Sequence, residues 1–116
     1  MLILKLINDA DFVVSYEVLD YKQWDRGMYY KLSIVFNDSS VLIAREYVDE
    51  LQRDYSFHWQ GSDNNMIIRW DNAPHYKELL TFPHHKHMAG RVIESRVVSL
   101  EDILNQIKGM LKDNKP

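Results

Sequence analysis

Apolar and polar residues alternate through much of the first two thirds of the chain, a period of two that is typical of β-strands with one buried face. The alternation is clear over residues 12–18 and 30–36, and it continues over residues 42–48. Between the last two stretches, Asn37–Ser40 supplies short polar side chains that bond their own backbone, as tight turns require. The pattern therefore predicts a β-hairpin over residues 28–48.

A second hairpin is predicted around the turn Gly61–Asn64. Large apolar residues share one face of its two strands: Tyr55, Phe57 and Trp59 before the turn, and Met66, Ile68 and Trp70 after it. Arg69 and Asp71 then lie on the opposite face. A turn of this length predicts Phe57 opposite Ile68, a cross-strand contact that contributes about 0.2–1 kcal/mol.

The alternation stops at residues 72–88, where Pro74 and Pro83 remove backbone hydrogen-bond donors. An irregular stretch of this length is long for a small domain, and such loops usually have a function. Four of the five histidines lie in it, so we interpret residues 72–88 as a functional loop. Alternation resumes afterwards and predicts a final strand at about residues 91–98.

A C-terminal helix is predicted over residues 99–113. Ser99 can cap the free amide groups at its start, and Glu101 and Asp102 complement the positive end of the helix dipole. Its apolar residues recur at three- and four-residue spacing, which buries one face of the helix: Leu100, Ile103, Leu104, Ile107 and Leu111.

These elements predict a single α+β domain over residues 1–116. Its sheet is twisted and antiparallel, with about five to six strands arranged as a meander of hairpins. One C-terminal α-helix packs against it. Along the chain, a strand-rich part at residues 10–71 precedes the histidine-rich loop at 72–88, the final strand and the helix.

The absence of cysteine and a short apolar N-terminus limit the classes of function. Without cysteine, disulfides, thiolate catalysis and zinc sites built on cysteine are excluded. The apolar stretch at residues 1–7 is too short for a signal sequence or a membrane span. We therefore expect a cytoplasmic protein that does not associate with membranes.

The net charge of −3 is distributed unevenly along the chain. Residues 1–54 carry six basic and ten acidic side chains, a balance of −4. Residues 55–98 carry five basic and four acidic side chains, a balance of +1, and hold all five histidines. A bound polyanion would therefore lie against the second segment, although so small a difference does not by itself indicate one.

The segment TFPHHKH, residues 81–87, suggests acid–base chemistry because histidine titrates near neutral pH. Cleavage of RNA by its own 2′-hydroxyl needs a base, an acid and cations that hold the charge on the phosphate, and it needs no metal ion. The loop and its flanking strands supply these types: His84, His85, His87 and His75 for proton transfer, and Arg69, Lys86 and Arg91 for RNA binding.

Neighbouring residues of an extended segment point to opposite sides, so His84 and His85 cannot both face one substrate. We therefore expect His85 and His87 to form the acid–base pair. His84 or His75 is the expected replacement for either of them. Asp71 would orient one of the imidazoles through its free N–H.

A metal site is the alternative for the same loop. His85 and His87 have the i, i+2 spacing that two ligands on one strand can use, and Asp71 or His75 could complete the set. The protein would then be a non-enzymatic binding protein with a histidine-rich metal or partner site. The spacing alone leaves both readings open.

The segment WDNAPHYKELLTFPHHKH, residues 70–87, resembles the central signature of the TumE family of toxins. The preceding YSFHWQ and IIRWDNAPH segments, within residues 55–75, fit this resemblance, as does SLEDIL at residues 99–104. The resemblance covers roughly residues 50–104, whereas residues 1–49 fit only in being strand-rich. At His75–Glu78 the family often has His-His-Pro-Glu, so any role of that second histidine does not carry over to this chain.

The resemblance implies a toxin that is encoded beside an antitoxin and held inactive by it. We therefore predict the toxin of a type II toxin–antitoxin system that acts on RNA as a metal-independent endoribonuclease, without cofactors. Its partners would be the cognate antitoxin and the RNA substrate, and the sequence leaves a homodimer open. A nucleotide-modifying enzyme is a third hypothesis, but the chain has no nucleotide-binding motif to support it.

Overall fold

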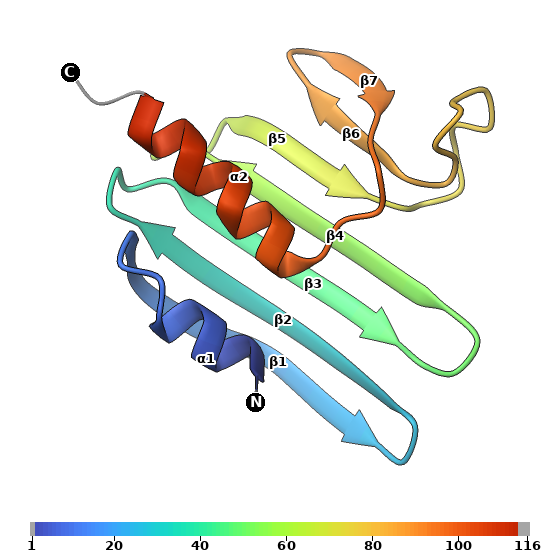
Figure 1. Cartoon of the computed structure of the whole chain (residues 1–116), viewed down its shortest axis with the longest axis horizontal. Coiled ribbons are helices and arrows are strands. Elements are labelled where there is room, and N and C mark those ends of the chain that lie inside the picture. Colours follow the sequence, from blue (N-terminus) through green and yellow to red (C-terminus); the bar gives the residue numbers. More distant parts are fainter. Residues whose placement is uncertain (1, 114–116) are drawn as a thin grey trace.

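The computed structural model describes residues 2–113 and contains a seven-stranded antiparallel sheet. Every strand pairs with the next along the chain, so the sheet is an open meander (Figure 1). The strands are β1 (Val13–Trp24), β2 (Gly27–Phe36), β3 (Val41–Val48), β4 (Arg53–Gln60), β5 (Met66–Asp71), β6 (His85–Met88) and β7 (Arg91–Glu94). The helices are α1 (Leu2–Asn8) and α2 (Leu100–Asp113). The α+β meander is confirmed, with seven strands instead of five to six.

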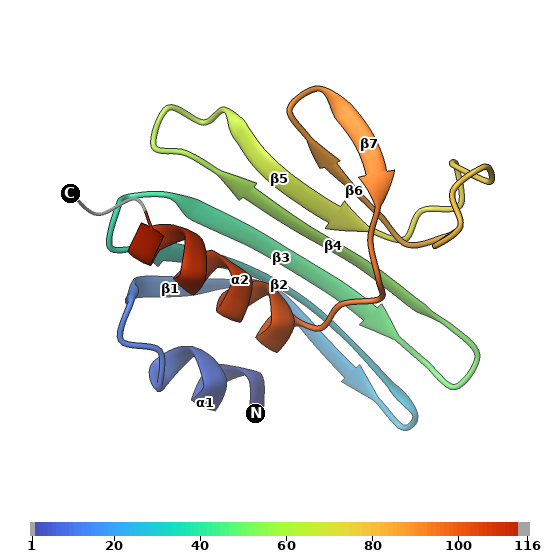
Figure 2. The same cartoon turned by 45° about the horizontal axis from the view of Figure 1, so that its top comes forward.

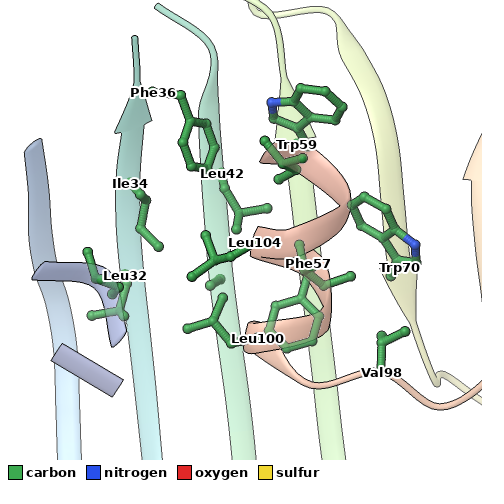
Figure 3. Close-up of a cluster of buried hydrophobic side chains, with 14 of the residues drawn as sticks. Leu32, Ile34, Phe36, Leu42, Phe57, Trp59, Trp70, Val98, Leu100 and Leu104 are labelled. Carbon is green, nitrogen blue, oxygen red and sulfur yellow. The ribbon is translucent and has the colours of Figure 1, made fainter. Parts of the chain in front are cut away.

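Both helices pack against one face of the sheet, which we call the covered face (Figures 1 and 2). Alternate residues of β2–β5 are buried there, and Figure 3 shows Leu42, Phe57 and Trp70 gathered around Leu104 of α2. Neither helix lies on the other face, which we call the open face. Within the described residues, neither helix has the length and hydrophobicity that a membrane crossing needs.

Helix α2 begins as its sequence predicts. The Ser99 hydroxyl accepts a hydrogen bond from the Asp102 amide at 3.1 Å, and the Asp102 carboxylate accepts one from the Ser99 amide at 2.8 Å. This reciprocal cap satisfies two amide groups that the helix leaves free. The five apolar residues at three- and four-residue spacing are all buried, as the spacing requires.

Three segments differ from the prediction. Residues 2–8 form a helix instead of a plain apolar stretch, and Ile7 is buried in the core. The loop predicted for residues 72–88 ends early, because the backbone of His85–Met88 pairs with β5 and β7. The final strand stops at Glu94 instead of residue 98, because the next amide, that of Ser95, donates to the Thr81 hydroxyl at 3.1 Å.

The hairpin of β4 and β5 has another register than predicted. Phe57 faces Trp70 instead of Ile68, a shift of two residues, and the pairing is irregular after Trp59. A shift of two residues returns each side chain to its original face of the sheet. The prediction that Arg69 lies opposite the apolar face therefore holds despite the wrong register.

Candidate functional site

Polar side chains from neighbouring strands meet on the open face of the sheet. Residues that face each other across an antiparallel pair point to the same side. Two rows run across the strands in this way: Lys31, Arg45, Ser56, Asp71 and His85 form the first, and Ile43, His58, Arg69 and His87 the second. The end of both rows, at β5 and β6, gathers the titratable groups.

Asp71, the last residue of β5, is the centre of this cluster and is buried. One of its oxygens, Oδ1, lies 2.9 Å from His85 Nε2 and accepts the Ala73 amide at 3.0 Å. The other, Oδ2, lies 3.4 Å from His87 Nε2 and accepts from Arg69 Nε at 3.3 Å. A buried carboxylate needs such partners, because burial without them is costly. The four partners therefore hold Asp71 in one orientation.

His85 is enclosed, with only 1% of its surface exposed. Its Nδ1 lies 2.9 Å from the Pro83 carbonyl, and its Nε2 faces Asp71. Both neighbours are hydrogen-bond acceptors, so the ring satisfies both only when each nitrogen carries a proton. The Tyr76 ring meets the imidazole edge-on, with 4.7 Å between the ring centres. His85 is therefore fixed in place and shielded from solvent.

His87 is the accessible imidazole of the cluster. Its side chain is 26% exposed, and its ring centre lies 5.0 Å from that of His85. Burial lowers the pKa of His87, Asp71 opposes that shift, and the positive fields of His85 and Arg69 reinforce it. The net effect is a pKa below the ordinary value, so His87 is mostly neutral at neutral pH.

The other two histidines of the loop lie outside the cluster. His84 points away from His85, and its Nδ1 lies 2.8 Å from the hydroxyl of Tyr55, whose ring stacks on it. His75 is exposed, and its ring lies edge-to-face with that of Tyr76, at 6.5 Å between centres. Alternation correctly predicts that His85 and His87 share a side and His84 does not.

The cations that the sequence suggested for RNA binding divide between the two faces. Arg69 joins the cluster on the open face. Lys86 faces Trp70, and Arg91 faces Met88, so both belong to the side of the covered face. The open face instead carries Arg45, which was not among the predicted RNA-binding residues, although the alternation of its strand places it on this face. The Tyr76 ring also packs against His85, and nothing in the sequence links these two residues.

The cluster also has the composition of a metal site. Asp71, His85 and His87 each offer one ligand atom, and these atoms lie within 4.8 Å of one another. Two imidazoles and a carboxylate form a donor set that suits zinc. The Pro83 carbonyl on Nδ1 of His85 is also the kind of partner that orients a ligating histidine.

Comparison with known proteins gives one match. The model of a family described as Toxin TumE matches residues 3–113, from α1 to α2. The chain belongs to the TumE toxin family. The match extends beyond the segments that resembled this family in the sequence and includes residues 3–49. Membership indicates a toxin function and implies an antitoxin partner. Neither the curated proteins nor the solved structures include a significant match.

Proposed function

We propose that the protein is the RNA-cleaving toxin of a type II system, in which a protein antitoxin holds it inactive in the cytoplasm. One observation carries this proposal: the buried Asp71 carboxylate joins a partly exposed imidazole, His87, to the guanidinium of Arg69. Attack by the 2′-hydroxyl of RNA requires a base and a cation, and in this cluster the two lie side by side.

His87 would act as the base. Its Nε2 is turned toward Asp71, which leaves the lone pair of Nδ1 to accept the proton of the 2′-hydroxyl. A carboxylate that takes the N–H of an imidazole fixes the ring and stabilises the cation that forms when the base is protonated. The lowered pKa of His87 keeps the ring ready to accept at neutral pH.

Arg69 would hold the charge on the phosphate. Its side chain is 40% exposed, and Nε is held by Asp71 at 3.3 Å. A guanidinium has five N–H donors in a planar fork, so it can keep this bond and still bind phosphate oxygens. Donors that are fixed before the reaction stabilise the developing charge without reorganisation.

His85 would be a positioning residue and not half of an acid–base pair, because its buried ring cannot contact RNA. It would hold the Asp71 carboxylate in its orientation beneath His87 and Arg69. In the reaction, the 2′-oxygen bonds to phosphorus as the bond to the 5′-oxygen breaks. His87 takes the 2′-proton, water donates a proton to the 5′-oxygen, and His87 returns its proton to solvent. The products are a 2′,3′-cyclic phosphate and a free 5′-hydroxyl.

The test compares His87→Ala with His75→Ala, a loop histidine outside the cluster, in RNA cleavage by purified protein. Loss of a general base typically slows a reaction by about 10²–10⁴-fold, so we expect that loss for His87→Ala and none for His75→Ala. The ends of the fragments should carry 2′,3′-cyclic phosphate. Undiminished cleavage by folded His87→Ala would refute the assignment.

A divalent metal site is the second candidate function, favoured by the convergence of Asp71, His85 and His87 within 4.8 Å. Elemental analysis of protein purified without added metal distinguishes the two candidates. Stoichiometric zinc that is lost in His87→Ala, together with RNA that stays intact, would support the metal site. Metal-free protein that cleaves RNA in the presence of a chelator would support the nuclease.

A further inference from the structure

The open face carries a hollow beside the histidine cluster. Its volume is about 300 Å³, and its walls come from four adjacent strands: Lys31, Ile43, Arg45, Ser56, His58 and Arg69. A second hollow of about 240 Å³ shares Arg45, Ser56 and Arg69 with the first and reaches Asp71. The three residues that line both hollows therefore connect the middle of the sheet with the histidine cluster.

Two cations of this hollow lack an acidic partner. Lys31 and Arg45 are half-buried and face each other across β2 and β3. Among the described side chains, residues 3–111, no carboxylate oxygen lies within 4 Å of a side-chain nitrogen of either residue. This holds although Asp20 faces Lys31 in register and Asp54 lines the second hollow. Like charges directly opposite each other destabilise a sheet, so an anion between them would relieve the repulsion.

Three other arginines of the described chain do have acidic partners. Arg53 binds Glu46 at 2.7 Å, and Arg26 binds Glu50 at 2.8 Å. Arg69 binds Asp71 and uses a second nitrogen to donate to His58 Nδ1 at 3.4 Å. Lys31 and Arg45 are therefore the two cations of the hollow without a carboxylate partner among the described side chains.

The neutral groups of the hollow are also donors. Because a guanidinium can only donate, the bond from Arg69 makes Nδ1 of His58 an acceptor and leaves the proton on Nε2. Burial and the nearby Arg69 lower the pKa of His58, which keeps the ring in this neutral form. The Ser56 hydroxyl also lines both hollows. Ammonium, guanidinium, imidazole N–H and hydroxyl groups together match the oxygens of a phosphate.

We propose that Lys31 and Arg45 bind a backbone phosphate of the RNA strand next to the one held at Arg69 and His87. This inference rests on the proposed function, because it takes the strand to be RNA and the cluster to be the site of cleavage. Adjacent strands are about 4.8 Å apart, so Arg45 on β3 lies two strands, or roughly 10 Å, from Asp71 on β5. The RNA would run across the strands of the sheet, from the cluster toward β2.

The test measures binding instead of cleavage, with an oligonucleotide whose 2′-hydroxyls are all methylated. Binding is followed by fluorescence anisotropy at several salt concentrations for wild type, Lys31→Gln and Arg45→Gln. Each lost phosphate contact lowers the salt dependence of binding to a single strand by about 0.7 in the slope of log K against log salt. Because Lys31 and Arg45 share one phosphate, we expect each variant to lower the slope by up to that amount, with weaker binding at low salt.

Two controls sharpen this test. Lys108→Gln removes the same charge from an exposed position on α2, and it should leave the slope unchanged. Arg45→Lys keeps the charge and should keep the wild-type slope. Wild-type slopes in both glutamine variants would overturn the proposal. So would adenosine monophosphate or inorganic phosphate that binds as tightly as the oligonucleotide, because the site would then serve a free phosphate compound.

The two proposals fail separately. The methylated strand has no nucleophile, so its binding does not depend on His87 as a base. Unchanged slopes together with cleavage that is lost in His87→Ala would refute only the phosphate site. Reduced slopes together with cleavage that persists in His87→Ala would refute only the nuclease mechanism. Thermal melts of each variant establish that it is folded.

Discussion

The two faces of this sheet are built from the same strands, but they differ in burial and in charge. On the covered face, Phe57 and Trp70 face each other and are buried beneath α2. One residue away on each strand, Ser56 and Asp71 face each other on the open face, among charged groups. Neighbours in the sequence therefore differ in their surroundings: one side chain packs in the core, and the next lies among polar and titratable groups.

The largest effect on stability should come from the covered face, and β3 offers a matched pair. Leu42 is fully buried there, whereas its neighbour Ile43 is half-buried on the open face. Leu42→Ala removes packed methyl groups and leaves a cavity, so we expect a loss of about 2–5 kcal/mol in the free energy of unfolding. Ile43→Ala should cost clearly less in urea denaturation. Equal losses would mean that the open face also contributes to the core.

Acid should destabilise the protein, because several histidines have a lowered pKa in the folded state. Burial, with Arg53 and His85 nearby, lowers the pKa of His84 in the folded state. A lowered pKa means that the unfolded chain binds the proton more readily, so this contribution is complete above the ordinary pKa of about 6.5. It is lost as the pH falls through the lower folded value.

His84→Gln should therefore flatten the decrease in unfolding free energy below pH 6.5. It should not abolish the decrease, because the pKa values of His58 and His87 are also lowered. His75→Gln, at an exposed position, should leave the decrease unchanged. Urea denaturation at several pH values measures all three proteins. A steeper decrease in His84→Gln would contradict the assigned direction.

The smallest effect has the opposite sign. Arg45→Gln removes one of two like charges that face each other on the open face, and its other cross-strand neighbour is the neutral Ser56, so it should stabilise the fold by a few tenths of a kcal/mol, up to about 1 kcal/mol. The same variant should bind RNA more weakly. A urea midpoint that falls instead would mean that Arg45 contributes to stability.

Much of the covered face could be predicted from the sequence, because burial of every second residue produces an alternation of apolar and polar residues along each strand. The helix was predictable for the same reason, since Ser99 and the spacing after it are local signals. Strand β6 was not, because His85–Met88 has no apolar alternation and becomes a strand only by pairing with its neighbours. The helix α1 is too short for its apolar pattern to distinguish it from a strand.

The open face was predictable only in part. Alternation separates His84 from His85 and His87, and it places Asp71 on the same face of the sheet as Arg69. It cannot reveal that His85 is enclosed, because this depends on the Pro83 carbonyl and the Tyr76 ring. Nor can it bring Lys31 and Arg45 to the cluster, since their positions depend on the register of three successive strand pairs.

The pH dependence of RNA cleavage by wild type and Asp71→Asn tests the central claim most directly. If His87 is the base, kcat/KM of the wild type rises with pH through the lowered pKa of His87 and then levels off. The charge of Asp71 raises that pKa, so Asp71→Asn should shift the rise to lower pH and reduce the plateau. A rise that stays at the same pH in Asp71→Asn would contradict the account.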